Sequence, residues 1–499
     1  MLTQADVDAS RSPPMVRRRL AGGWGGPALP GAWPAVVALA VVGFAVLFVG
    51  LVRVRPAYDA YGWLVWGRQA AHLRLNTSAA PSWKPLTFLF TFWYALLLGS
   101  GAVWLWMVTA VAAGFAAPVL AARIAYRLTG PAAAPRYARV AASAFAAAGV
   151  LGIGGYWHFL LIATADPMIV ALCLAAIDAI ASGRPRAAWL LLVLASLGRP
   201  EASPLVLVFA VWAWRGRVVA RPLLVGGIVA IPALWFGIPA LTSYSWLIAG
   251  NVLDESTNPL AGNKVVAVMD GFTGLYELPM QLAVLFTLGL ALVLRERIWL
   301  LMTGAAVVWL GVDVGLALHG SGIAPRYTFE PAAVLIVLAG AGLGRLLALE
   351  PHRVPPLTLR AYRVPLIRLA AIAALGALMV SLASPARLRG RLVHNGIELG
   401  RTWARQLDRL HGVIAADGGP KAMLACGQAV TEVSYQSILA WELDENVVQV
   451  GWQPQASIRR RLPILLFEPK GAGWQVRTLN SPAGKVAQCR RLNTTTALG

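Results

Sequence analysis

The sequence predicts an all-α polytopic membrane protein with a small C-terminal α/β domain. Of its 499 residues, 58% are hydrophobic and only 13% are charged, a composition that is unusual for a soluble globular chain. Long apolar runs recur between residues 33 and 384, and many approach the length of a bilayer crossing. After residue 385 the apolar runs shorten and charged residues become frequent.

About eleven apolar runs are expected to cross the bilayer. Two of them, 187–198 and 202–214, are short and meet at the polar turn "LGRPEASP", so we expect two short, tilted spans. The segment "PLTFLFTFWYALLLGSG" (85–101) is short for a span and is expected to form an interfacial helix. The expected spans lie near 33–52, 101–121, 140–156, 166–182, 187–198, 202–214, 222–239, 279–294, 298–318, 329–349 and 368–384.

The formal net charge of +21 comes mainly from arginine clusters between the apolar runs. Such clusters specify cytoplasmic loops, so the charge indicates topology and argues against nucleic-acid binding. The distribution predicts a multi-pass membrane protein with a cytoplasmic N-terminal segment (1–32) and a transmembrane domain (33–384). The excess of arginine over lysine and the abundant alanine suggest a GC-rich bacterial genome, and hence a bacterial plasma membrane. Its first outer loop is 53–100, and the domain at 385–499 is extracytoplasmic.

The C-terminal region is expected to fold as a small α/β domain. The segments "KAMLACGQAV", "NVVQVGWQ" and "LPILLFE" are typical of short strands or buried segments. The preceding "IELGRTWARQLDRLHGVIAADGG" has helical spacing and ends at glycines. Two of the three cysteines, Cys426 and Cys489, fall in this domain, and the sequence leaves their pairing open.

Polar and aromatic side chains collect at the expected outer ends of the spans. Charged groups near a bilayer are costly unless they are paired or hydrated, so a water-filled cavity at this interface is the natural inference. The candidates are Asp59, Trp63, Trp66, Arg68, Trp83 and Lys84 in the first loop, Asp166, Arg199 and Glu201 at two corners, and His319, Arg326 and Tyr327 in "HGSGIAPRYTFEP".

The layout of residues 33–350 resembles the GT-C glycosyltransferase superfamily. The shared features are a first span, a carboxylate (Asp59) in a long first loop, P-x-x-x-P-L opening an interfacial helix, and an acid (Asp166) at the corner before the fourth span. Members are integral membrane enzymes that use polyprenyl-phosphate sugars, among them actinobacterial arabinofuranosyl- and mannosyltransferases. Many have a second acid after the first-loop aspartate, where this chain has Ala60.

The resemblance implies transfer of a sugar from a polyprenyl-phosphate donor to a glycan, lipid or protein acceptor at the outer face. Asp59 would be the general base, because an ordinary carboxylate is ionised at neutral pH. Asp166 would be a second carboxylate, for the acceptor or for a divalent cation such as Mg²⁺ or Mn²⁺. Lys84, Arg199 and Arg326, with Arg68 behind them, would hold the phosphate, and the three loop tryptophans would contact sugar or lipid.

Structural roles compete with each of these assignments. Asp166 precedes a proline and is well placed to cap the fourth span. Arg199 and Glu201 are close enough in sequence to pair with each other, and tryptophans often form interfacial belts. Two alternative functions remain: a transporter or flippase of lipid-linked precursors, and a non-catalytic membrane scaffold with a glycan-binding outer domain.

Overall fold

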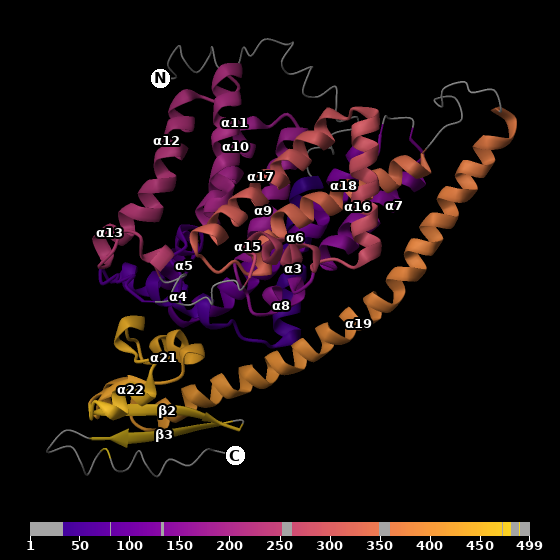
Figure 1. The fold of residues 1–499 in the computed structure, drawn as a ribbon. Helices are drawn as coiled ribbons and strands as arrows, with labels where there is room; N and C mark the ends of the chain where they lie inside the picture. Colours follow the sequence, from indigo (N-terminus) through magenta and orange to yellow (C-terminus); the bar gives the residue numbers. More distant parts are fainter. Residues whose placement is uncertain are drawn as a thin grey trace.

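The computed structural model describes residues 33–79, 81–130, 134–251, 262–348, 360–471, 473–480 and Cys489. The expected cytoplasmic segment 1–32 lies outside the described residues. The chain forms a large helical body followed by one long helix and a small sheet-containing domain (Figure 1). The helices of the body are α3 (Trp33–Val52), α4 (Tyr58–Ala71), α5 (Pro85–Leu98), α6 (Ala102–Leu128), α7 (Arg136–Leu151), α8 (Tyr156–Leu161), α9 (Asp166–Ala181), α10 (Pro185–Gly198), α11 (Ser203–Gly216), α12 (Arg221–Pro232), α13 (Ile238–Thr242), α15 (Lys264–Thr273), α16 (Leu278–Leu294), α17 (Arg297–His319) and α18 (Phe329–Leu347).

The body has the surface of a multi-pass membrane protein. Among the described residues, five helical segments are long and apolar enough to cross a membrane, or six if the bent pair α15–α16 is one span. Leucine and valine side chains point outward on several helices, for example Leu47, Leu207 and Leu301. Contiguous exposed apolar surface of this kind is suited to lipid rather than to water.

Several expected spans are shorter than a full crossing. Helices α7 and α9 have 16 residues each, and α10 and α11 have 14 each. At the helical rise these helices measure about 21–24 Å, less than the hydrocarbon core of about 30 Å. The count of eleven spans therefore stays a prediction. The two short spans expected on either side of "LGRPEASP" are present as α10 and α11, separated by the 3₁₀ turn Pro200–Ala202.

The core of the body is built around α18. Nearly every residue of this helix is buried, because α6, α7, α16 and α17 pack around it. Close packing against neighbours is helped by glycines in α18: a Cβ at Gly340 would lie 2.7 Å from the carbonyl oxygen of Ala142 in α7. The loop that leads into α18 is thereby fixed against the rest of the body.

Helix α4 packs equally closely on α5. A Cβ at Gly67 would lie 2.4 Å from the carbonyl oxygen of Thr91, and a Cβ at Gly62 would lie 2.1 Å from the ring of Pro81. Glycine is required at Gly67 because the backbone of α5 approaches so closely, and at Gly62 because the Pro81 ring does. Helix α5 continues through the 3₁₀ turn Gly99–Gly101 into α6, and its expected interfacial placement stays a prediction.

One helix joins the body to the C-terminal domain. Helix α19 runs from Arg360 to Ala416 and passes through residue 385, where the sequence suggested a domain boundary, without a break. In Figure 1 it descends along one side of the body and ends beside the sheet. The expected helix stop is present, since Gly418 has a φ of +89°.

The C-terminal domain is the expected small α/β unit. Its sheet has the order β1-β2-β3, with β1 parallel to β2 and β2 antiparallel to β3. The segment "NVVQVGWQ" is not a strand: Val447–Gln449 form a 3₁₀ turn because Asn446 and Gln449 make a capping box. The elements are α20 (Gly419–Leu424), β1 (Gln428–Val430), α21 (Gln436–Glu442), α22 (Pro454–Arg459), β2 (Ile464–Lys470) and β3 (Gly473–Leu479).

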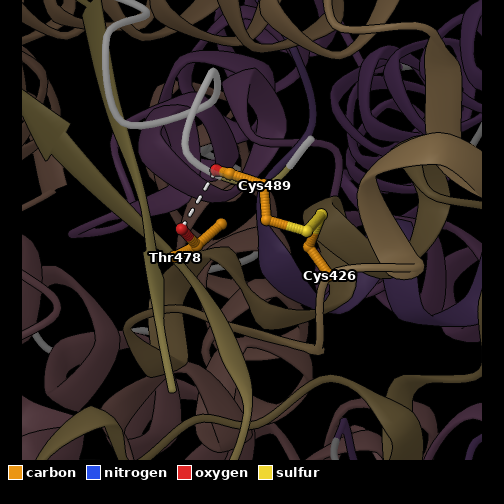
Figure 2. The surroundings of a disulfide bond; sticks show 3 residues. All are labelled: Cys426, Thr478 and Cys489. Atoms are coloured by element: carbon orange, nitrogen blue, oxygen red, sulfur yellow. Dashed lines mark hydrogen bonds between the residues drawn. A yellow bond between two sulfur atoms is a disulfide. The ribbon is translucent and has the colours of Figure 1, made fainter. Parts of the chain in front are cut away.

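A disulfide closes this domain. Cys426 and Cys489, whose pairing the sequence left open, are bonded to each other, and Thr478 donates a hydrogen bond to the carbonyl oxygen of Cys489 at 3.1 Å (Figure 2). Both cysteines are fully buried. The bond ties the residues after β3 to the start of β1, which stabilises a unit too small to bury a large core.

Candidate functional site

A cavity of about 480 Å³ lies where α4, the loop before α5, the α10–α11 turn and the loop before α18 meet. These segments are far apart in the sequence. Seven of the residues that the sequence marked as site candidates line the cavity: Asp59, Trp63, Lys84, Arg199, Glu201, Arg326 and Tyr327.

Asp59 presents a carboxylate that is free to act on a ligand. It lies in the first turn of α4 and is half-buried at the cavity. Among the described residues, no hydrogen bond or ion pair engages its side chain, although its charge acts on both Lys84 and Arg326. An unpaired carboxylate keeps its oxygen lone pairs available to a ligand.

Lys84 contributes the first of these cations. Pro85, the first residue of α5, favours an extended backbone at Lys84, which has φ −137° and ψ 106°. The ammonium lies 5.5 Å from the centre of the Trp63 ring, and none of the described carboxylates forms an ion pair with it. Burial lowers the pKa of Lys84, and the positive charges of Arg199 and Arg326 add to this effect.

Arg326 contributes the second cation. It lies in the 3₁₀ turn Pro325–Thr328, which leads into α18. Its guanidinium lies 5.2 Å from the centre of the Phe159 ring and 5.5 Å from that of Tyr327. In the part of the chain that the structure describes, Arg326 has no carboxylate partner, and its Nε is buried without a hydrogen bond. The aromatic rings therefore hold the guanidinium while its charge remains available.

Arg199 differs because three carboxylates surround it. It forms an ion pair with Asp166, while Glu201 lies 3.6 Å and Glu330 3.5 Å from its guanidinium nitrogens. The Tyr327 ring lies 4.2 Å from the guanidinium carbon. All of these side chains are almost fully buried. Arg199 is therefore neutralised within the protein, and the expected pairing with Glu201 is one part of a larger cluster.

Asp166 belongs to this cluster and does not line the cavity. It is the first residue of α9, with Pro167 following it, but the predicted capping role is wrong, because the N-cap residue is Ala165 and no side chain caps the helix. Its carboxylate is directed to Arg199, whose guanidinium also donates to the carbonyl oxygen of Arg326 at 3.4 Å. Asp166 thus holds Arg199 against the loop that carries Arg326, and its charge also acts on both Lys84 and Arg326.

Two buried acids near the site are not among the residues predicted from the sequence. Glu330 lies in the first turn of α18, and Asp313 lies in α17, fully buried with no hydrogen bond to either oxygen among the described residues. Each is a single acid in an apolar run, which is the one signal that could have indicated them. Glu330 is a member of the cluster around Arg199, whereas Asp313 only interacts electrostatically with Arg199 and Glu201.

Four predicted site residues lie elsewhere. Trp66 and Trp83 are buried and pack on each other with ring centres 5.4 Å apart, and Trp83 donates to the carbonyl oxygen of Leu234 at 3.0 Å. Both fill the space between α4 and α5. His319 is exposed at the end of α17. Arg68 points from α4 to the C-terminal domain, where it contacts α21.

A metal site requires several ligating side chains close together. Within the described ranges, no three histidine, cysteine, aspartate or glutamate side chains are arranged to hold a metal ion. Asp59 and Asp166 are separated in role as well, since the second is committed to Arg199.

One side of the cavity is apolar. Trp235, Phe236, Trp246 and Leu247 line it, and the last three are also partly exposed on the surface of the body. A ligand with an anionic group and an apolar chain would meet cations at one side and aromatic or aliphatic surface at the other. The adjacent free carboxylate adds the capacity to accept a proton.

Comparisons with known proteins give a structural likeness only. No family model matches the sequence, and no curated protein matches it. The structure is similar to that of ArnT from Cupriavidus metallidurans bound to undecaprenyl phosphate, with 15% identity, a TM-score of 0.48, and coverage of 91% of this chain and 99% of that one. The apo structure of the same protein gives 15% identity, a TM-score of 0.47, and coverage of 88% and 93%.

Proposed function

We propose that this protein transfers a sugar from a polyprenyl phosphate to an acceptor hydroxyl, with Asp59 as the general base. The observation that carries the proposal is the cavity itself. It combines one unpaired carboxylate, Asp59, with two cations that lack carboxylate partners among the described residues, Lys84 and Arg326. The cations suit the phosphate, and the carboxylate suits the hydroxyl that attacks.

The reaction balances with these groups alone. The acceptor oxygen forms a bond to the anomeric carbon, and the bond from that carbon to the phosphate oxygen breaks. Asp59 takes the proton that the acceptor hydroxyl loses. The polyprenyl phosphate leaves with one more negative charge, which Lys84 and Arg326 stabilise. A single displacement of this kind inverts the configuration at the anomeric carbon.

The position of the cavity also favours a lipid-borne donor. Its apolar side is lined by Trp235, Phe236 and Trp246, and the last two are also exposed on the outside of the helical body. A polyprenyl chain could extend there while its phosphate reaches the cations. The sugar and acceptor would lie towards α4, next to Asp59.

We place the site at the outer face of a bacterial plasma membrane, with the C-terminal domain outside the cell. The buried Cys426–Cys489 disulfide supports this orientation, because disulfides persist in oxidising compartments. The acceptor would then be a glycan, lipid or protein of the cell envelope. The C-terminal domain lies directly beside α4 and would contribute to the acceptor side of the site (Figure 1).

The test is the variant Asp59→Asn, which keeps size and polarity but cannot accept the proton. We expect loss of transfer by about 10²–10⁴-fold, the usual contribution of a general base. Mass spectrometry of envelope glycans from a deletion strain complemented with each variant measures transfer. Binding of undecaprenyl phosphate by the purified protein should be retained, since the cations are intact.

Asp270→Asn is the matched control, because Asp270 is exposed on α15 and does not line the cavity. Glycans made at the normal level by the Asp59→Asn strain would contradict the proposal and favour a transporter or a scaffold. Normal glycans are expected for the Asp270→Asn strain.

A further inference from the structure

The first turn of α4, which carries Asp59, is held by the C-terminal domain. Ser437 of α21 donates a hydrogen bond from its hydroxyl to the carbonyl oxygen of Tyr58, the residue before Asp59. The Tyr58 hydroxyl donates to the side-chain carbonyl of Gln436 at 3.2 Å. The backbone amide of Ala57 donates to the carbonyl oxygen of Ile162 at 3.1 Å, which is the attachment of this turn to the body.

Gln436 and Ser437 are rigid parts of their own domain. Both are almost fully buried. The Gln436 amide also donates to the carbonyl oxygens of Val447 at 3.1 Å and Val450 at 2.7 Å. All the hydrogen-bonding groups of this side chain are therefore committed, so its contact with Tyr58 has a fixed direction.

The other end of α4 is fixed to the same helix of the C-terminal domain. Arg68 donates to the carbonyl oxygens of Ala440 at 3.2 Å and Trp441 at 3.0 Å, lies 3.0 Å from the Asp444 carboxylate, and stacks over the Trp441 ring at 4.4 Å. These carbonyls belong to the last turn of α21, where a cation satisfies groups that the helix leaves unpaired. Arg68, which the sequence predicted as a phosphate ligand, binds the C-terminal domain instead.

Helix α4 is thus held between two surfaces. One side packs against the loop before α5 and against α5 itself, where Gly62 and Gly67 allow backbone approach. The other side lies on α21, with polar contacts at both ends. The positions of the two cavity cations are not set by α21. Lys84 and Arg326 lie on other segments, and neither forms a hydrogen bond or an ion pair with α21 among the described residues.

We propose that Ser437 and Arg68 are positioning residues, through which the C-terminal domain sets the place of Asp59 relative to the phosphate site. This inference rests on the proposed role of Asp59. According to this inference the site has two parts. The helical body alone positions the phosphate-binding cations, whereas the position of the proton-accepting carboxylate also requires the C-terminal domain.

The test uses the full-length protein with Ser437→Ala and Arg68→Met, singly and together. A displacement of the base by about 1 Å can cost a hundredfold in rate, so we expect the double variant to lower the glycan product about a hundredfold. Each single variant should lower it less. Arg68→Lys keeps the charge but presents one nitrogen to two carbonyls, so it should give a partial effect.

Binding of undecaprenyl phosphate and the thermal unfolding midpoint are measured on the same variants. We expect the dissociation constant to stay at the wild-type value. Hydrogen exchange at the amides of residues 58–62 should accelerate, because the first turn of α4 has lost its partner. Asp408→Asn is the matched control: it breaks an exposed ion pair of 2.7 Å between Arg55 and α19, another link between the two parts, and should leave product, binding and exchange unchanged.

Two results would overturn the inference. Wild-type product from the folded double variant would show that α21 does not position the base. A joint loss of product, lipid-phosphate binding and thermal stability would show a merely structural contact. Activity of Asp59→Asn in the same assay would instead contradict the proposed function, so the two failures are distinguishable.

Discussion

Each end of α9 carries an aspartate, and the two differ in whether the charged groups around them are paired. Near the C-terminal end, Asp178 lies between Arg123 at 2.7 Å and Arg127 at 3.2 Å, and Arg127 also donates to Ser182 at 2.8 Å. At the N-terminal end, Asp166 pairs with Arg199 beside a cavity whose other cations have no carboxylate partner among the described residues.

This difference separates structural charge from charge that is available to a ligand. At the Asp178 end the charged side chains pair with one another, so these charges need no ligand as a partner. At the Asp166 end only Arg199 is satisfied, whereas Asp59, Lys84 and Arg326 face a cavity. Unpaired charge at a membrane interface is costly, so its presence in a cavity indicates a ligand that supplies the missing partner.

The largest effect on stability is expected from Arg199→Met. Removal of this guanidinium takes away the ion-pair partner that Asp166, Glu201 and Glu330 share among the described residues, which costs about 3–5 kcal/mol. The thermal unfolding midpoint of the purified protein should fall accordingly. Arg127→Met is the matched change at the other end of α9, and it should cost less because Arg123 still pairs with Asp178. Equal losses from the two variants would contradict the comparison.

The next effect concerns ligand binding. Lys84→Met and Arg326→Met should each weaken binding of undecaprenyl phosphate by about 1.5–3 kcal/mol, the contribution of a hydrogen bond to a charged group. Thermal stability should change little, because neither side chain leaves a buried carboxylate unpaired. Calorimetric titration measures the affinity, and Arg127→Met should bind normally. Unchanged affinity in both cavity variants would place the phosphate elsewhere.

The smallest effect is a dependence on pH. Because burial lowers the pKa of Lys84, its positive charge is lost at a lower pH than that of an exposed lysine. Affinity for undecaprenyl phosphate should therefore fall as the pH rises through this lowered pKa. Measurements above about pH 8 keep the charge of the phosphate ester constant.

Lys84→Arg is the control for this dependence, since a guanidinium stays protonated throughout the range. Its affinity should be flat where that of the wild type falls. Parallel pH profiles for the two proteins would show that another group is responsible for the fall in affinity.

Much of the cavity was predictable from sequence. Asp59, Lys84, Arg199 and Arg326 each lie just beyond an apolar run, and residues at the ends of spans on one face tend to meet. Asp313 and Glu330 were missed because a single acid within an apolar run has no visible partner in the sequence. Arg68 was assigned to the phosphate because the fold of the C-terminal domain, which gives it other partners, could not be derived.

The sequence by itself determined that the chain is a helical membrane protein with ionisable groups gathered at the ends of its spans. The reason is local: apolar runs of spanning length and the cost of burying charge leave few other arrangements. Only the tertiary structure decided which charges neutralise one another and which stay free. Ion pairs such as Arg199–Asp166 and Arg68–Asp444 depend on distances through space between segments that are remote along the chain.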